Sequence, residues 1–411
     1  MDGSWPARTV EGRDIEGADI GRTSWGNEDI MNTSDINSPV VILSSVRWDF
    51  LWQRKQSFAI LFARAGYPTI YVETGLSNPS LDRDIARKVL RRILLAGGEG
   101  RKMPDMPPNL TIYSPLLAPP TRRIFRRLNR AVFVPRVARD LKRLLNDIPP
   151  VVITYPPTRT TLDLLPRLKP RLTLYDCSDN YEGFAGVPHD IALTERELLE
   201  KVDLVSCTSA FLLEKARLIR PDAFLSAPAV DYERFAVLQG SRSGGPVRTV
   251  CFFGHIGEAR VDFSILKGLA QRGFEVRLVG GVGRVEKGFF ALPRVDYRGE
   301  VSHADLPAAL AGTDAFVIPY QINAQTLGIS PAKIYECIAT GIPVVATPLP
   351  EFERFDGHIY MARDAEGFAK VLRRLPQLET EEKARARIRL ARENSWEVRF
   401  AALEKEIWRK L

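Results

Sequence analysis

The chain has 411 residues, 45% of them hydrophobic, which allows two domains with substantial cores and excludes a disordered or fibrous protein. Its formal net charge is +8, so we expect an anionic partner, such as a nucleic acid, a lipid surface or a phosphorylated substrate. No apolar run approaches the ~20 residues that span a bilayer, and the N-terminus lacks the basic start and apolar middle of a signal peptide, so the expected location is the cytoplasm.

Residues 1–37 are polar and show no hydrophobic period, which predicts a flexible N-terminal arm. The region 38–239 alternates short apolar runs with helical patterns, as in VVILSS (40–45) and TIYVET (69–74). This alternation favours a parallel sheet in a Rossmann-like domain. Further strands are expected at 110–115, 151–156, 171–176 and 203–209, and FLSAPAV (224–230) leads out of the domain.

The region 81–145 is densely basic and predicted to be largely helical. Within it, arginines alternate with apolar side chains: Arg122, Arg123, Arg126, Arg127 and Arg130 with Ile124, Phe125 and Leu128. One interpretation is a solvated helix face, and the other is a patch that binds an anionic membrane surface. A nucleic-acid partner is not expected, because the basic segments hold few aromatic residues and no RNA-binding motif.

The stretch 240–247, GSRSGGPV, predicts a linker to a second Rossmann-like domain at 248–394. The residues 395–411 predict an amphipathic helix whose large apolar side chains fall near one face. The four cysteines are far apart, without CxxC spacing, and are expected to be small buried residues, not disulfide partners or zinc ligands.

The most informative stretch is 313–348, which predicts a buried strand, a loop, a helix and another buried strand. Pro331 would open the helix, with Ser330 as its cap. The free backbone N–H groups there could bind a diphosphate. Lys333 and Glu336 lie one turn apart and could hold a phosphate and a sugar's vicinal hydroxyls, or they could be a solvated pair on an ordinary βαβ unit.

The segment SPAKIYECIATGIPVVAT resembles the donor-binding region of family-4-like glycosyltransferases with the two-Rossmann (GT-B) fold. It is similar to the branch that carries SPxKxxEYLAxGxPVVAT, which includes teichuronic acid and exopolysaccharide glycosyltransferases. LTLYDCSDNYEGF, ELLEKVDLVSCTSAFLLEKA and PAVDYERF match other passages of the group. The resemblance implies an α/β fold with two Rossmann-like domains facing a cleft, an acceptor-binding first domain, a donor-binding second domain and a C-terminal helix that crosses back.

The resemblance also implies roles for residues at the donor site. Many relatives carry Glu-x7-Glu, but here Gly328 occupies the first position, so Glu336 alone is expected to contact the ribose. The loop after the strand 248–254 adds small and cationic residues suited to phosphate. The expected donor-binding residues are Gly254, His255, Gly257, Arg260, Ser330, Pro331, Lys333 and Glu336.

Asp176 and Asp179 are the candidate catalytic bases, because one ends a strand and the other follows in the loop. The expected acceptor-binding residues, in the first strand-to-helix loop, are Trp48, Asp49, Trp52 and Arg54. The only Asp-x-Asp text, Asp82 to Asp84, begins a basic helix, so transfer is expected to be metal-independent, with no cofactor besides the donor substrate.

These features predict a cytoplasmic glycosyltransferase, peripheral on the inner face of the cell membrane, in surface polysaccharide biosynthesis. It would move a sugar from a nucleotide-diphosphate sugar to a saccharide or a lipid-diphosphate-linked saccharide. The alternative is a sugar-nucleotide epimerase of the same architecture, which would need no acceptor. No residue pattern specifies the sugar, the base of the nucleotide or the stereochemical outcome.

Overall fold

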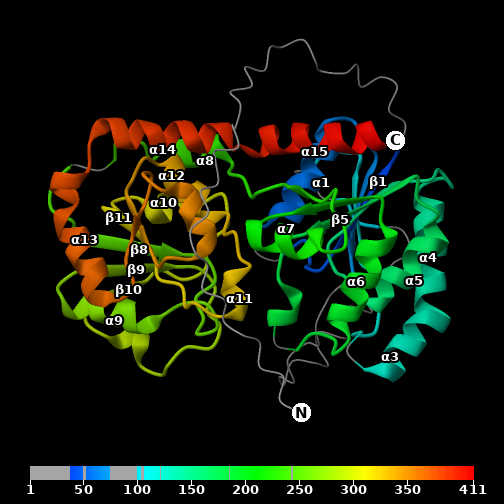
Figure 1. The fold of residues 1–411 in the computed structure, drawn as a ribbon, viewed down its shortest axis with the longest axis horizontal. Helices are drawn as coiled ribbons and strands as arrows, with labels where there is room; N and C mark the ends of the chain where they lie inside the picture. The colour runs from blue at the N-terminus through cyan, green and yellow to red at the C-terminus, as the bar shows by residue number, and fades with distance from the viewer. Residues whose placement is uncertain are drawn as a thin grey trace, which may run out of the picture. The chain divides into compact units, whose positions relative to one another are not determined.

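The computed structural model describes residues 38–49, 52–74, 100–102, 106–120, 122–184, 186–241 and 244–411. The predicted arm at 1–37 and the Asp82 to Asp84 text lie outside these residues. Two parallel sheets organise the described chain, and we call the residues around them the first lobe (38–241) and the second lobe (244–393) (Figure 1).

The first lobe contains a seven-stranded sheet in the order β3-β2-β1-β4-β5-β6-β7, and every pairing is parallel. Its strands are β1 (Val40–Ser44), β2 (Thr69–Glu73), β3 (Leu110–Tyr113), β4 (Val151–Thr154), β5 (Leu172–Cys177), β6 (Leu204–Cys207) and β7 (Phe224–Leu225). The order reverses direction between β1 and β4, as in doubly wound nucleotide-binding folds.

Helices on both faces cover this sheet. They are α1 (Arg54–Arg64), α3 (Arg123–Leu128), α4 (Val134–Leu144), α5 (Arg159–Leu168), α6 (Ile191–Lys201) and α7 (Ala210–Arg217), with a π-helical turn, η2 (Asn129–Phe133), between α3 and α4 and a 3-10 turn, η3 (Tyr181–Gly183). The short helix α8 (Tyr232–Ala236) follows in the chain but packs on the second lobe, whose core includes Tyr232 and Phe235. The helix α1 begins at Arg54, where the side chain of Gln56 accepts a hydrogen bond from the backbone N–H of Gln53 and caps the first turn.

The second lobe repeats the design with six parallel strands in the order β10-β9-β8-β11-β12-β13. They are β8 (Thr249–Phe253), β9 (Glu275–Val279), β10 (Val295–Tyr297), β11 (Ala315–Ile318), β12 (Val344–Ala346) and β13 (Tyr360–Met361). The helices are α9 (Phe263–Gln271), α10 (Leu306–Leu310), α11 (Ala324–Leu327), α12 (Lys333–Ala339), α13 (Ala365–Leu378) and α14 (Glu381–Glu393), with 3-10 turns η4 (Phe289–Ala291) and η5 (Pro350–Phe355).

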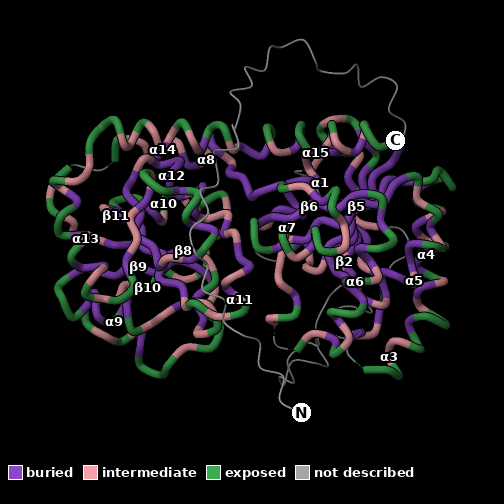
Figure 2. Tube along the Cα trace, viewed as in Figure 1, coloured by how far each residue is buried: buried purple, intermediate pink, exposed green. Residues whose placement is uncertain are grey.

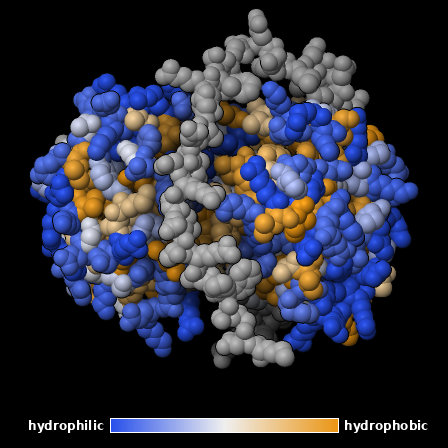
Figure 3. Space-filling model, viewed as in Figure 1, coloured by the Kyte–Doolittle hydropathy of each residue, from blue (hydrophilic) through white to orange (hydrophobic). Residues whose placement is uncertain are grey.

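The central strands are buried along their whole length, as their continuous runs of Val, Ile and Leu predict (Figure 2). Each lobe has its own apolar core around its sheet. The visible surface of the described residues is mostly hydrophilic, with scattered apolar patches (Figure 3). All four cysteines are buried and unpaired, as predicted.

The chain ends in a helix that crosses to the first lobe, which confirms the predicted crossover. At the crossing, the backbone N–H of Trp396 donates to the carbonyl of Val230, where the chain passes between the lobes for the first time. Helix α15 (Trp396–Lys410) then packs on α1, with Phe400 edge-to-face on Phe62 at 4.9 Å. The Tyr67 hydroxyl donates to Glu404 at 2.6 Å, so both apolar and polar contacts hold the helix.

The two lobes also touch directly on the side of α11. Asn180 donates from its amide to the carbonyl of Ala324 at 3.1 Å, and the Ser209 hydroxyl donates to the carbonyl of Gly328 at 3.1 Å. Within the described ranges, no helix is both long and apolar enough to cross a membrane.

Candidate functional site

A cavity of about 760 Å³ lies between the lobes, at the carboxyl ends of their parallel strands. Its walls come from the loops after β1 and β5 in the first lobe and after β8, β9, β10 and β11 in the second. Ligands of open α/β sheets bind at this edge, because strand ends there present loops and backbone groups that no helix covers.

The structure brings together most of the predicted site residues. Ten of them line the cavity: Asp49, Trp52, Asp179, Gly254, His255, Arg260, Ser330, Pro331, Lys333 and Glu336. Four predicted residues do not line it: Trp48, Arg54, Asp176 and Gly257.

Lys333 projects its ammonium to the end of β8. The Nζ atom donates to the carbonyl of Phe253 at 2.5 Å and lies 4.0 Å from the ring centroid of Phe252. Gly254 makes room for it, since a Cβ at this position would lie 2.7 Å from Nζ. The backbone of Gly254 also has φ +105°, a conformation that side chains rarely adopt. The glycine after β8 is therefore required by the lysine that faces the cavity.

The start of α12 differs from the prediction. The helix begins at Lys333, and Ser330 does not cap it. Instead, the Ser330 hydroxyl donates to Glu351 at 3.1 Å, and the other oxygen of Glu351 accepts from the backbone N–H of Ala210 in the first lobe. Ser330 is thus part of a contact between the lobes, while Pro331 and Ala332 present backbone to the cavity.

Glu336 lies in the first turn of α12 and faces the cavity next to His303. The distance from His303 Nε2 to Glu336 Oε1 is 3.6 Å. The His303 ring stacks on Trp52 of the first lobe, with centroids 6.0 Å apart and planes 14° apart. Trp52 therefore joins the two walls by stacking on His303.

The loop after β8 adds two further basic side chains. Burial lowers the pKa of His255, and the charges of Arg260 and Lys333 lower it further, against the opposing effect of Glu300. The Arg260 guanidinium lies 5.7 Å from the ring of Phe184 in the first lobe. Gly257 supports His255 from behind, since a Cβ at 257 would lie 3.2 Å from the His255 Nε2 atom. Gly257 itself does not line the cavity, and its predicted contact with a donor stays a prediction.

The packing around Gly328 explains why no glutamate stands there. A Cβ at 328 would lie 2.8 Å from the Cβ of Asn180 and 3.3 Å from the ring of Phe211, both in the first lobe. A longer side chain could not fit between the lobes in this arrangement.

Asp176 is placed away from the cavity and needs a correction. Its side chain is 0% exposed, accepts from Arg54 Nε at 2.6 Å and accepts from the Ser206 hydroxyl at 2.7 Å. Arg54 is buried as well and also donates to Ser226. The buried pair joins α1 to β5, so neither the proposed base role of Asp176 nor the acceptor contact of Arg54 fits this geometry.

Asp179 remains the better candidate base. It lies two residues beyond β5 and faces the cavity, and its carboxylate accepts from the Ser178 hydroxyl at 3.0 Å. A carboxylate at a cavity wall can accept a proton from a bound hydroxyl.

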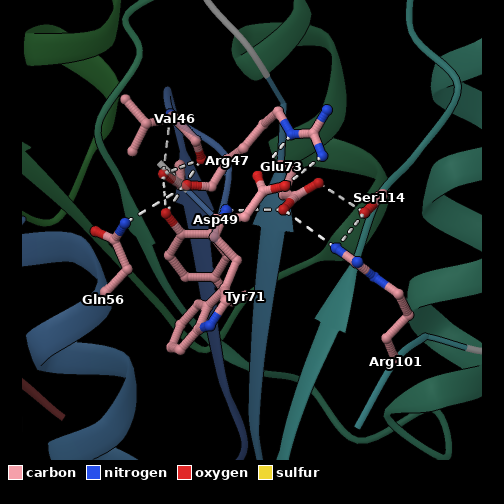
Figure 4. A network of polar contacts seen from close by, with 10 residues as sticks. Val46, Arg47, Asp49, Gln56, Tyr71, Glu73, Arg101 and Ser114 are labelled. Atoms are coloured by element: carbon pink, nitrogen blue, oxygen red, sulfur yellow. Dashed lines mark hydrogen bonds and ion pairs between the residues drawn. The ribbon is translucent and has the colours of Figure 1, made fainter. Parts of the chain in front are cut away.

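A polar network at the ends of β2 and β3 holds the first-lobe loop in place (Figure 4). Glu73 accepts from the backbone N–H of Trp48 at 2.8 Å and from the Ser114 hydroxyl at 2.7 Å. The Trp48 ring packs edge-to-face on Tyr71 at 5.0 Å. Trp48 is therefore a buried support for the loop that presents Asp49, and its predicted contact with an acceptor is wrong for this arrangement.

Sequence reasoning missed four residues at this site: Lys55, Tyr181, Glu300 and His303 line the cavity. Lys55 and Tyr181 lie one and two residues after the predicted site residues Arg54 and Asp179, so these positions in the sequence could have indicated them. Glu300 and His303 lie between β10 and α10, in a loop with no pattern that indicates a site. In the residues that the structure describes, no group of three or more His, Cys, Asp or Glu side chains is arranged to hold a metal ion.

Comparisons with known proteins agree with this architecture. Residues 264–405 match a family described as Glycosyl transferase-like. TuaH of Bacillus subtilis (strain 168), whose name assigns it to teichuronic acid biosynthesis as a glycosyltransferase, is 25% identical over 202 residues, covering 43% of this chain and 50% of that protein. The chain thus matches about half the length of this curated relative.

Two solved structures share the fold over nearly their whole length. HepE of Anabaena (Alr3699), solved with UDP and glucose, has a TM-score of 0.59 and 13% identity, covering 90% of this chain and 99% of that one. The lipopolysaccharide outer core galactosyltransferase WaaB, in its apo form, has a TM-score of 0.59 and 12% identity, covering 91% and 100%. The predicted fold with two Rossmann-like domains is confirmed, as is the resemblance to GT-B glycosyltransferases. These matches do not support the epimerase alternative.

The role of Gly254 in leaving space for Lys333 can be tested by comparing substitutions at Gly254 and at another glycine of the second lobe. Gly273 also has a positive φ, +94°, but no atom lies within 4 Å of its would-be Cβ. We expect Gly273→Ala to cost about 1–2 kcal/mol of unfolding free energy through backbone strain alone. Gly254→Ala should cost about 2–4 kcal/mol, because it also displaces the Lys333 ammonium from the Phe253 carbonyl.

Urea unfolding of both variants measures the difference. A second arm adds Lys333→Ala to Gly254→Ala, which should restore part of the lost stability by removing the clash. Equal losses for Gly254→Ala and Gly273→Ala would contradict the assigned position of Lys333.

Proposed function

We propose that this chain is a glycosyltransferase that moves a sugar from a nucleotide-diphosphate sugar to a saccharide or lipid-linked saccharide. The observation that carries the proposal is the composition of the second-lobe wall. Lys333 and Arg260 face the cavity, and among the described residues neither forms an ion pair with a carboxylate. Cationic side chains at a cavity wall that form no ion pair of their own are suited to bind a diphosphate.

The donor would bind against this wall. Lys333 and Arg260 would neutralise the diphosphate as it leaves, and the backbone at Gly254 and Pro331 allows close approach. Glu336 would accept hydrogen bonds from the ribose hydroxyls, with His303 beside it. The likeness to HepE, whose structure holds UDP and glucose, supports a nucleotide diphosphate as the ligand.

The acceptor would bind against the first-lobe wall, on the opposite side of the cavity. Asp179 would accept the proton of the attacking hydroxyl, while Asp49 and Trp52 would contact the acceptor's sugar. None of these steps calls on a metal ion, in keeping with the metal-independent mechanism that we propose.

The donor site is tested by thermal shift with UDP, GDP, dTDP and ADP. We expect one of them to raise the melting temperature, and Glu336→Ala to weaken its binding by about 10- to 100-fold through the loss of charged hydrogen bonds. Glu366→Ala is a matched control, since Glu366 also lies in the first turn of a second-lobe helix but is exposed and outside the cavity. If no nucleotide shifts the wild type, the proposed function fails.

The assignment of the base is tested with Asp179→Asn. The turnover number should fall by about 10²- to 10⁴-fold while the affinity for the nucleotide stays near that of the wild type. Asp176→Asn should instead lower the unfolding free energy by about 3 kcal/mol, because it leaves Arg54 buried beside a neutral partner. Near-normal turnover in the Asp179 variant would remove this residue as the base.

We further propose that the basic face around α3 binds an anionic membrane surface, which would place a lipid-linked acceptor near the cavity. Three apolar side chains four residues apart, Ile124, Leu128 and Val132, are exposed on α3 and η2. Exposed arginines flank them at 122, 123, 127 and 130; the Arg130 side chain lies 3.9 Å from Asp163, and Arg126 forms a closer ion pair with Asp190. Exposed apolar residues between exposed arginines are typical of helices that lie in a lipid interface.

Replacing Arg122, Arg123 and Arg127 together by Glu should release the protein from vesicles with anionic lipids in a sedimentation assay. We expect binding to fall by about tenfold or more, since each basic residue contributes about 1 kcal/mol at such a surface. A control with the same change in net charge replaces three exposed arginines elsewhere, Arg284, Arg385 and Arg409. Equal losses in both triple variants would refute a specific patch.

A further inference from the structure

The first-lobe wall of the cavity contains a buried ammonium group without a counter-charge. Lys55, in the first turn of α1, is 3% exposed and lines the cavity. Its Nζ donates to the side-chain oxygen of Gln53 at 3.2 Å, a neutral partner. No carboxylate in the described ranges lies within ion-pair distance, although Asp179 and Asp176 are near enough to influence the group.

Burial makes a positive charge on this group unfavourable. It lowers the pKa of Lys55; the charges of Asp179 and Asp176 oppose this effect, and those of Arg54 and Arg260 add to it. The first turn of α1 contains no acidic residue that would compensate the positive end of the helix dipole. Arg54, the adjacent residue, has Asp176 as its ion-pair partner, whereas among the described residues Lys55 has only the neutral Gln53 side chain and the Tyr155 ring, whose centroid lies 5.1 Å from Nζ.

A second polar group on the same wall is poorly satisfied. The Tyr181 side chain is 1% exposed and lines the cavity, and its hydroxyl makes no hydrogen bond of normal geometry, although the Ser178 and Ser45 hydroxyls are near enough to influence it. Buried hydroxyls of this kind are rare, and they often mark the place of a missing ligand or water. Tyr181 and Lys55 both interact electrostatically with Asp179, so the ammonium without a counter-charge and the phenol hydroxyl adjoin the candidate base.

We propose that Lys55 and Tyr181 bind an anionic oxygen group, a phosphate or a carboxylate, carried by the acceptor next to the hydroxyl that receives the sugar. This inference rests on the proposed function and specifies the acceptor's chemistry. An ammonium and a phenol hydroxyl together offer a positive charge and hydrogen-bond donors to such a group. The anion would give Lys55 a counter-charge and Tyr181 a hydrogen-bond acceptor. The group belongs to the acceptor because these residues share a wall with Asp179, whereas Lys333 faces the donor from the other lobe.

The test measures melting temperatures of the purified protein with glucose 6-phosphate, glucuronate, glucose and UDP, each over a concentration series. Glucose 6-phosphate and glucuronate distinguish a phosphate from a carboxylate, glucose is the neutral control, and UDP reports on the donor site. We expect at least one anionic sugar to stabilise the wild type, and Lys55→Met to weaken its binding by about tenfold or more. The response to UDP should be unchanged.

Two further variants separate binding from a structural role. Tyr181→Phe removes only the hydroxyl and should weaken the binding of the same anionic sugar by a few-fold. Lys267→Met, at an exposed lysine on α9 outside the cavity, should leave every response unchanged. Without ligand, the Lys55→Met protein should melt no lower than the wild type, since it no longer buries an unpaired charge.

Several results would overturn the inference. If Lys55→Met weakens the binding of UDP as strongly as that of the anionic sugars, the lysine binds the donor's diphosphate. If it lowers the melting temperature of the ligand-free protein, the lysine is a structural partner of Asp179. A wild type that responds to UDP but to neither anionic sugar would reject an anionic acceptor and leave the proposed function intact.

Discussion

The packing of the C-terminal helix on the first lobe is the contact on which the rest of this structure depends. Phe400 and Trp396 pack on Phe62 and Phe58 of α1, and Tyr67 donates to Glu404 beside them. Helix α1 also presents Lys55 to the cavity and pairs Arg54 with β5. The C-terminal helix α15 therefore stabilises α1, a helix from the N-terminal part of the chain that forms part of the cavity wall.

Charged side chains near the strand ends are divided between structural groups and groups that face the cavity. Asp176 and Glu73 lie outside the cavity lining, and each accepts hydrogen bonds that hold loops or helices together. Asp179, Lys333 and Arg260 keep their charged ends at the cavity. A buried charge that is paired with a partner is not available to a ligand, whereas a charge at the cavity wall can contact one. This division gives the cavity one cationic wall and one wall with a candidate base.

Close approach of the lobes explains the glycines at their junction. A Cβ at Gly328 would collide with Asn180, and a Cβ at Gly183 would lie 3.1 Å from the backbone of Gln325. Both positions sit where α11 meets the loop that contains Asp179. The absence of the first glutamate of the Glu-x7-Glu pattern is thus a consequence of how tightly the lobes pack in this arrangement.

The sequence by itself determined the alternation of strands and helices, the two parallel sheets and the stretch from Ser330 to Thr347, because these follow from local periodicity and a continuous motif. It also placed Lys333 and Glu336 correctly on one helix face. Only the tertiary structure decided that Asp179 faces the cavity while Asp176, three residues earlier, is buried against Arg54. It alone showed that Ser330 contacts Glu351 and that Lys55 lacks a counter-charge. Such roles depend on partners in other elements, from 21 residues away for Ser330 and Glu351 to 122 for Arg54 and Asp176, and no local pattern encodes those contacts.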